Sequence, residues 1–203
     1  MSVPPDRRES DHREIEVKIE VRDLAEIRER LAALGARAQG ERLFEDNRLY
    51  DDRTRSLERS RKLLRLRRYG DEHLLTVKTP VAEDAGAVSA GGHSEVYKVR
   101  KEYETRVEDP QQVDLMLHAL GYLVTYRYQK YRQVYHLGRL SIEVDETPIG
   151  SFIEIEGSPG EIDDTARKLG FGKQDYITKT YRQLHRERAS ADPPGDMVFP
   201  NAT

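Results

Sequence analysis

The chain has 203 residues, with 34 Lys and Arg against 37 Asp and Glu, so that 35 % of it is charged while its net charge is only −3. It contains no cysteine, which excludes disulfides, thiolate catalysis and cysteine-ligated zinc, and no apolar run of about 18 residues that could cross a membrane. Its N-terminus lacks the apolar stretch of a signal peptide, so we expect a cytoplasmic protein. The near balance of charges argues against a dedicated nucleic-acid binder.

The two ends of the chain differ in composition from the rest. Residues 1–12 and 188–203 are polar and rich in proline, and we expect them to form a disordered N-terminal tail and a flexible C-terminal tail. Residues 14–21 alternate strictly between charged and apolar side chains, which predicts a half-buried strand. Asp23 then begins a helix, and Glu26 is placed to complete a capping box with it.

Strand patterns dominate the folded part, which we place at residues 13–187 as one domain. Residues 80–93 are rich in Ala and Gly and indicate a flexible loop. Strand–helix–strand units that begin near 14 and near 100 share a layout, so we expect two pseudo-equivalent halves in an α+β fold of antiparallel strands. Further strands are predicted near 36–50, 62–69, 73–79, 94–107, 122–137, 139–146 and 150–157. Further helices are predicted from Pro110 to Gly121, over 159–169 and over 174–187.

One face of most predicted strands is apolar, and the other is almost entirely ionised. Successive side chains of a strand point to opposite faces, so residues of equal parity share a face. Carboxylates two residues apart on one face lie roughly 7 Å apart and repel each other unless a cation lies between them. Hard divalent cations prefer carboxylate oxygens, so these pairs indicate a metal site. Four pairs occur, namely Glu14 and Glu16, Glu102 and Glu104, Glu143 and Asp145, and Glu154 and Glu156.

Basic side chains occupy the same charged faces. Arg accounts for 25 of the 34 basic residues, and its planar fork suits phosphate oxygens. A sheet with one wet face would hold these charges as a lattice of salt bridges. A sheet that curls into a barrel with its charged face inward would instead bind a metal ion and a polyanion together, as phosphoryl-transfer sites do. The cations on these faces are Lys18, Arg65, Arg67, Lys78, Arg100, Arg106, Lys130 and Arg132.

One window of the chain is basic enough to contact nucleic acid. Between Arg53 and Arg68 the only acidic residue is Glu58. Within this window, however, Arg65 and Arg67 share one face of a predicted strand, which favours a role facing a substrate inside the fold. We therefore expect neither a nucleic acid nor a membrane as a partner.

The order of these motifs resembles that of the CYTH superfamily, the triphosphate tunnel metalloenzymes. The segment Glu14–Lys18 matches the ExExK signature of that superfamily, and the likeness extends over residues 13–187. Later motifs follow in the superfamily's order. They are Leu64–Arg67 (LRxR), Leu75–Lys78 (xTxK), Arg100–Glu104 (RxExE), Lys130–Arg132 (K/R-x-R), the closing strand Phe152–Gly157, and a terminal helix Tyr176–Tyr181 that contains Lys179.

The resemblance implies an eight-stranded antiparallel β-barrel with a charged interior and helices packed outside, which binds a triphosphate with Mg²⁺ or Mn²⁺. It implies that Lys18, Lys78 and Lys179 take part in catalysis. The implied metal ligands are Glu14, Glu16, Glu104, Glu143, Asp145, Glu154 and Glu156. The implied triphosphate contacts are Lys18, Arg65, Arg67, Lys78, Lys130, Arg132 and Lys179.

Within the superfamily the chain is most similar to the class IV adenylate cyclases, which implies conversion of ATP to cyclic AMP and pyrophosphate. Triphosphatases share the same motifs, so hydrolysis of inorganic triphosphate, thiamine triphosphate or a nucleoside triphosphate is the alternative. A non-catalytic polyphosphate-binding module would keep the basic residues and lose the metal carboxylates, which are present here. The expected partner is a small triphosphate, and the expected oligomeric state is a monomer or a homodimer.

Overall fold

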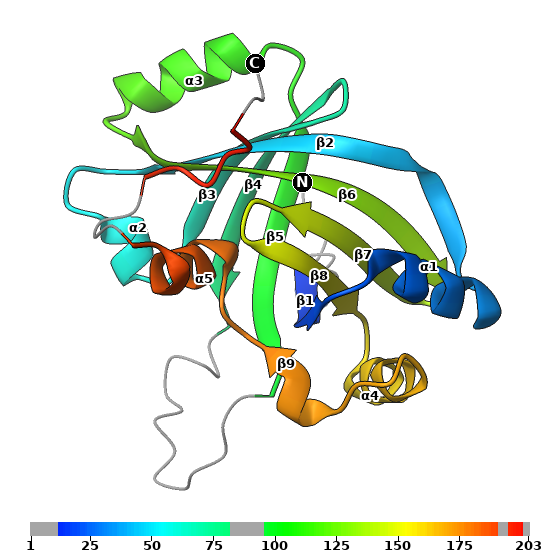
Figure 1. Ribbon diagram of the computed structural model, residues 1–203. Coiled ribbons are helices and arrows are strands. Elements are labelled where there is room, and N and C mark those ends of the chain that lie inside the picture. The colour runs from blue at the N-terminus through cyan, green and yellow to red at the C-terminus, as the bar shows by residue number, and fades with distance from the viewer. Residues whose placement is uncertain (1–11, 82–95, 191–194, 201–203) are drawn as a thin grey trace, which may run out of the picture.

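Eight antiparallel strands close into a barrel in the computed structural model, which describes residues 12–81, 96–190 and 195–200 (Figure 1). The predicted fold class is confirmed, and every predicted strand is present. The strands are β1 (Arg13–Val21), β2 (Arg37–Asp51), β3 (Leu63–Tyr69), β4 (Glu72–Pro80), β5 (Lys98–Arg106), β6 (Leu123–Leu137), β7 (Leu140–Thr147), β8 (Gly150–Glu156) and a short β9 (Tyr176–Ile177).

The strand order of the barrel is β5-β4-β3-β2-β6-β7-β8-β1, and β1 pairs with β5 to close it. The first four strands and the last four take equivalent places, because β1 and β5 meet at one seam while β2 and β6 meet at the other. β9 pairs with β1 at Lys18 and Ile19, next to the stretch that pairs with β5. The units that begin at β1 and β5 therefore have the similar layout that the sequence predicts.

The helices lie outside the strands (Figure 1). The first helix begins where expected, because the carboxylate of Asp23 accepts the N–H groups of Ala25 and Glu26. Glu26 itself accepts from Arg30 and does not complete the predicted capping box. In the described part of the chain, no helix is long and apolar enough to cross a membrane. The helices are α1 (Leu24–Ala33), α2 (Ser56–Arg59), α3 (Pro110–Ala119), α4 (Pro159–Lys168) and α5 (Tyr181–Arg188).

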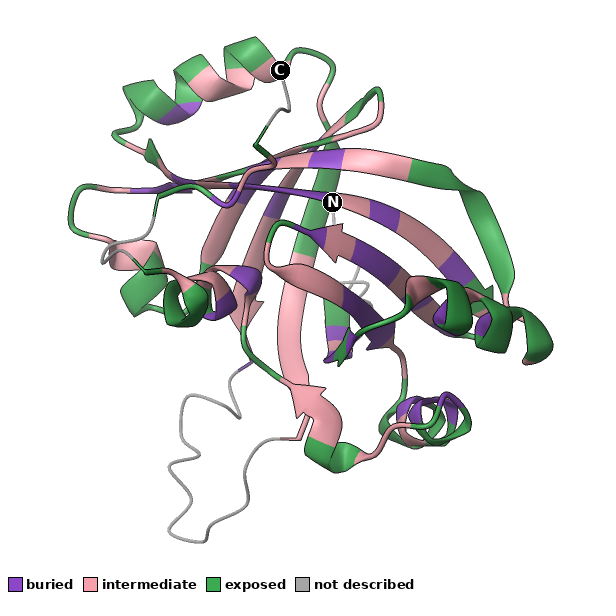
Figure 2. Ribbon diagram, viewed as in Figure 1, coloured by how far each residue is buried: buried purple, intermediate pink, exposed green. Residues whose placement is uncertain are grey.

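The main hydrophobic core lies between the barrel wall and the helices, not inside the barrel. Val17 and Ile19 of β1 are fully buried and share a cluster with Leu31 of α1 and Ile162 of α4. Figure 2 shows the buried stretches, in purple, along the strands and on the helices α1 and α4. Burial of apolar surface contributes roughly 25 cal/mol per Å², so this outer layer holds the helices to the sheet. The inward face of the strands is thereby left for charged side chains.

Two helix predictions need correction. The helix predicted over 174–187 begins only at Tyr181, because Tyr176 and Ile177 extend to pair with β1. The sequence analysis also missed α2, whose four residues are too few to show a helical period.

The prediction of a flexible C-terminal tail is wrong for residues 195–200. Residues 195–200 run along β6, and Met197 is almost fully buried there. Six residues are too few to show a periodic pattern from which this docking could be expected. Residues 1–11, most of the predicted loop at 80–93, and residues 191–194 and 201–203 of the tail lie outside the described residues.

Candidate active site

The inward faces of the barrel strands line a cavity of about 680 Å³. Its volume is typical of small-molecule sites, but its walls are ionised where such sites are usually apolar. All the site residues predicted from the sequence line this cavity except Asp145, which is fully buried behind the lining. The expectation of a charged face turned inward is therefore confirmed.

Carboxylates of β1, β7 and β8 form one wall of the tunnel. Glu16 lies directly opposite Glu156 in the β1–β8 pair, and Glu143 lies opposite Glu154 in the β7–β8 pair. Like charges at opposed positions of antiparallel strands repel and destabilise the sheet. Burial raises the pKa of Glu143 to about 8, and Glu154 adds repulsion, although Arg132 opposes the shift. Burial and the neighbouring Glu16 likewise raise the pKa of Glu156.

The two glutamates of β1 differ in their electrostatic surroundings. Burial and repulsion from Glu16 raise the pKa of Glu14 to about 7, although the Lys78 ammonium lies 2.7 Å from both oxygens of Glu14. Burial also disfavours the charge of Glu16, but the ammonium of Lys98 outweighs it and lowers the pKa to about 2. The pKa values of Glu14, Glu143 and Glu156 are all raised, because burial and neighbouring carboxylates outweigh the few cations nearby. This wall is therefore short of positive charge near neutral pH. A divalent cation would supply that charge.

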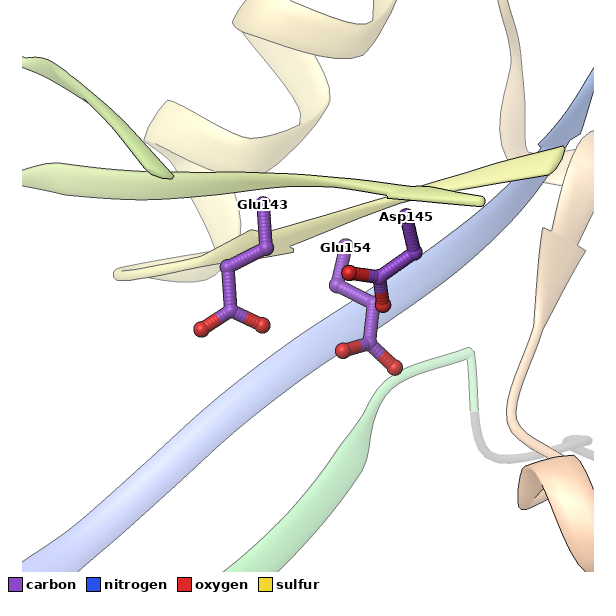
Figure 3. Close-up of side chains that lie close together, drawn as sticks. All are labelled: Glu143, Asp145 and Glu154. Atoms are coloured by element: carbon purple, nitrogen blue, oxygen red, sulfur yellow. The ribbon is translucent and has the colours of Figure 1, made fainter. Parts of the chain in front are cut away.

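Three carboxylates on this wall lie within reach of one ion. Glu143, Asp145 and Glu154 each offer one oxygen, and these oxygens lie within 4.8 Å of one another (Figure 3). The guanidinium of Arg132 contacts all three carboxylates, with Nε 2.7 Å from Asp145 Oδ1. Lys130 lies 3.0 Å from the other oxygen of Asp145. The hard oxygen donors fit a divalent cation, and both Asp145 and Glu154 are also paired with basic side chains.

The opposite wall, built by β3 and β4, presents cations. Arg65 donates to the Thr76 hydroxyl at 3.2 Å and to the Tyr128 hydroxyl at 3.3 Å, and Arg67 donates to Glu104 at 2.8 Å. The Nε atoms of Arg65 and Arg67 are buried and have no hydrogen-bond partner among the residues that the structure describes. A buried polar group left unpaired costs about 1–3 kcal/mol. Both arginines line the tunnel, so their guanidinium charge can act on an anion there.

Two lysines pair with carboxylates of the tunnel. The ammonium of Lys18 lies 2.5 Å from Glu154 and 4.3 Å above the ring of Tyr181. The ammonium of Lys78 bridges Glu14 and Glu102, at 2.7 and 2.9 Å. Burial opposes the charge of Lys78, but the carboxylates outweigh it and raise its pKa above the ordinary value. Both ammonium groups therefore lie among the carboxylates of the tunnel.

The sequence analysis missed Glu45 of β2. Its side chain is fully buried and lies 3.6 Å from both Lys130 and Arg132. Burial disfavours its charge, but these cations outweigh that and lower the pKa to about 2. The outward neighbours of Glu45 include Asp46 and Arg48, so the strand shows no alternation of apolar and polar residues that would have pointed to its inward face.

Lys98 of β5 was also missed, although a signal for it exists. It lies two residues before Arg100 and four before Glu102, and it therefore continues the parity of the charged face. In the structure it is the cation that contacts Glu16. Lys98 is the residue on the charged face that precedes Arg100, so following the alternation of the strand toward its N-terminus identifies it.

Lys179 lies at the mouth of the tunnel, away from the other predicted site residues. Its ammonium pairs with Glu187 of α5 at 2.7 Å, and both side chains are half exposed. At the same mouth, Arg182 of α5 lies 3.1 Å from Glu58 of α2. The catalytic and triphosphate-binding roles of Lys179 stay a prediction.

Comparison with known protein families gives a match over most of the chain. The family model described as the CYTH domain matches residues 12–181. A protein of Methanocaldococcus jannaschii named as a candidate adenylate cyclase is 22 % identical over 182 residues, which cover 84 % of this chain and 97 % of that protein.

Solved structures share the fold. A candidate adenylate cyclase of Vibrio parahaemolyticus superposes with a TM-score of 0.71 at 20 % identity, covering 84 % of this chain and 96 % of that one. A Hippeastrum candidate adenylyl cyclase, described as having a dominant triphosphatase activity, gives a TM-score of 0.60 at 19 % identity, covering 86 % of this chain and 95 % of that one. At these identities the likeness establishes the fold.

Proposed function

Because the chain belongs to the CYTH domain family, we propose that it is a divalent-metal-dependent enzyme that converts ATP to cyclic AMP and pyrophosphate. The observation that carries this proposal is the division of the tunnel into two walls. Carboxylates short of positive charge face buried arginines whose Nε atoms have no partner in the described residues. The Methanocaldococcus protein named as a candidate adenylate cyclase supports the choice of reaction.

The basic side chains of the tunnel would bind and orient the triphosphate. Arg65 and Arg67 offer N–H groups from one wall, and Lys18 and Arg132 offer theirs from the other. Mg²⁺ or Mn²⁺ bound by the carboxylates would neutralise charge on the phosphate oxygens. The metal ligands we propose are Glu14, Glu16, Glu104, Glu143, Glu154 and Glu156, with Asp145 behind them.

In the cyclase reaction, the ribose 3′-oxygen attacks the α-phosphorus. A new bond forms between that oxygen and the phosphorus, the bond from the phosphorus to the bridging oxygen of the β-phosphate breaks, and pyrophosphate leaves. The proton of the 3′-hydroxyl must pass to a base. A carboxylate of the tunnel that does not hold the metal ion would accept it.

Hydrolysis of a triphosphate is the second candidate, and the Hippeastrum protein described as having a dominant triphosphatase activity favours it. Water would then attack the terminal phosphorus in the same charged tunnel. The two reactions differ in which phosphorus is in line with the nucleophile, so the depth at which the triphosphate lies in the cavity decides between them.

A substrate panel tests the proposal. ATP, inorganic triphosphate and thiamine triphosphate are incubated with the protein and Mg²⁺ or Mn²⁺, and cyclic AMP, pyrophosphate and phosphate are quantified. Cyclic AMP with an equal amount of pyrophosphate is the expected result, and it should vanish in a folded Glu16→Ala variant. Phosphate without cyclic AMP would replace the cyclase by the triphosphatase. Turnover of none of the three would overturn both.

A further inference from the structure

The wall of the barrel has a gap along β6. One edge of β6 pairs with β2 over nearly its whole length, but the other edge pairs with β7 only from Tyr131 to Leu137. The backbone between Leu123 and Lys130 therefore has no strand of the barrel on that side. Exposed N–H and C=O groups of such an edge need other partners.

The C-terminal segment Asp196–Phe199 covers this gap. Met197 donates its N–H to the carbonyl of Arg127 at 3.0 Å and accepts from the N–H of Gln129 at 2.8 Å. The Asp196 carboxylate accepts from the N–H of Arg127 at 2.8 Å, and the N–H of Phe199 donates to the side-chain oxygen of Gln129 at 3.1 Å. The free edge of β6 is thereby satisfied by residues that lie more than 60 positions further along the chain.

The Met197 side chain reaches the inner end of this gap. It is 1 % exposed and packs in a cluster with Tyr128 of β6 and with Tyr181 and Leu184 of α5. Tyr181 thus lies between the C-terminal segment and the interior of the barrel. Removing the methionine side chain would leave a cavity directly behind Tyr181.

Tyr181 in turn touches the charged tunnel. Its hydroxyl donates to Asp145 Oδ2 at 2.7 Å, and Asp145 is the anion that holds Lys130 and Arg132. Tyr181 is thereby hydrogen-bonded to a carboxylate that positions both of these cations. Its ring lies beneath the ammonium of Lys18.

We propose that the C-terminal segment Asp196–Phe199 is part of the tunnel wall, and that Met197 is a positioning residue for the triphosphate-binding cations, acting through Tyr181 and Asp145. The family model ends at residue 181, so this segment lies beyond the part of the chain that defines the family. The inference rests on the proposed function, because the cations positioned are those assigned to the triphosphate. It adds a determinant of substrate affinity outside the barrel strands.

The docked segment can be disturbed without unfolding the barrel. Its attachment consists of the buried Met197 side chain, a contact between the rings of Phe199 and Tyr131 at 5.3 Å, and a few hydrogen bonds. The ordering of its residues opposes these contacts with a comparable entropic cost. The barrel strands and the helices α1 and α4 bury a separate core that does not include Met197. Substitutions in the segment should therefore change the site more than the fold.

Three variants of the full chain separate positioning from general stability. Met197→Ala removes the side chain behind Tyr181, and Met197→Leu restores most of its volume. Met116→Ala makes the same change at an exposed methionine of α3 and is the matched control. Asp196→Ala is a fourth variant that removes the carboxylate that accepts from the N–H of Arg127 and leaves Met197 in place.

Steady-state kinetics with Mg²⁺ and ATP or inorganic triphosphate, together with hydrogen exchange, form the test. Met197→Ala should raise KM by about tenfold while kcat changes by less than about threefold, because ground-state and transition-state binding weaken together. The amides of Arg127 and Gln129 should exchange faster, and those of β1 and β8 should not. Met197→Leu should recover the KM, Asp196→Ala should raise it less, and Met116→Ala should leave it unchanged.

The two possible failures are distinguishable. If the wild type turns over ATP or inorganic triphosphate and Met197→Ala has the same KM, the positioning role is overturned and the proposed function stands. If exchange at Arg127 and Gln129 is unchanged in Met197→Ala, the docking of the segment is overturned, whatever the kinetics. If the wild type turns over neither compound, the proposed function fails and the positioning role fails with it.

Discussion

At the scale of single residues, ion pairs take the place that apolar contacts have in an ordinary barrel. Arg132 has the most partners, since its guanidinium contacts Glu143, Asp145 and Glu154 and lies 3.6 Å from Glu45. Burial opposes its charge, but these carboxylates outweigh it and hold its pKa well above the ordinary value. Removing one member of such a network leaves buried charges without a counter-ion.

We therefore expect Arg132→Ala to lower the free energy of unfolding by about 3–5 kcal/mol and to abolish triphosphate binding. Arg167→Ala is the control, because it breaks an exposed pair with Asp164 on α4 and should cost at most about 1 kcal/mol. Urea denaturation of both variants measures the difference. Equal, small losses would show that the carboxylates around Arg132 accept water or protons at little cost.

The raised pKa of Glu143 gives a stability that depends on pH. The folded protein keeps the proton of Glu143 up to about pH 8, whereas the unfolded chain releases it near the ordinary value of 4.5. Unfolding therefore releases a proton between these values, and this residue's contribution to stability is lost as the pH rises, by up to about 1.4 kcal/mol for each unit.

Glu143→Gln should remove this loss. In metal-free buffer, the Tm of the variant minus the Tm of the wild type should rise by several degrees between pH 5 and pH 9. Each kcal/mol corresponds to about 2–4 °C. Glu41→Gln, at an exposed position of β2, is the control and should show no such trend. A Tm difference that is the same at every pH would contradict the raised pKa of Glu143.

At the scale of elements, α2 is held by two carboxylates, the buried one of Asp51 and that of Asp52, which accepts from the N–H and the hydroxyl of Ser56. Asp51, at the end of β2, accepts the N–H of Leu57 at 3.0 Å and that of Glu58 at 2.9 Å. Glu58 then pairs with Arg182 of α5, so that α2 and α5 meet at the mouth of the tunnel. A helix of four residues has no stability of its own and is held by such contacts.

Asp51→Ala should therefore loosen α2, lower the free energy of unfolding by about 1–3 kcal/mol and raise KM for the triphosphate. Asp109→Ala is the matched control, because Asp109 caps α3 by accepting the N–H of Gln112 at 2.9 Å, away from the mouth. It should cost about 1 kcal/mol and leave KM unchanged. Urea denaturation and steady-state kinetics measure both effects, and an unchanged KM in Asp51→Ala would separate α2 from the substrate.

The strands and most of the site could be predicted from the sequence, because a strand fixes the parity of its faces locally. In β1, Glu14, Glu16 and Lys18 alternate with apolar residues, and this alternation predicts which side chains face the tunnel and which face the core. The elements that were missed depend on distant partners. β9 exists because it pairs with β1, and Met197 is buried because β6 has a free edge. Glu45 was hidden because the outer face of its strand is also polar.

At the scale of the whole molecule, the barrel explains how a chain that is 35 % charged can fold with a net charge of only −3. The apolar residues are used outside the barrel, under α1 and α4, and the inner face carries ions of both signs. The pairing of these ions keeps the empty tunnel folded. A metal ion and a triphosphate bring further charge of both signs, so they can replace internal pairs without changing the balance.

Calorimetric titration of inorganic triphosphate into the protein, with and without Mg²⁺, tests most directly whether the tunnel binds a triphosphate together with a metal ion. The account predicts one site per chain, with an affinity that falls at least about tenfold in Arg67→Ala, which removes one buried guanidinium of the tunnel. It also predicts weaker binding when Mg²⁺ is omitted, because the carboxylate wall then repels the ligand. Absence of binding by the wild type, or an affinity that neither Arg67→Ala nor omission of Mg²⁺ changes, would contradict it.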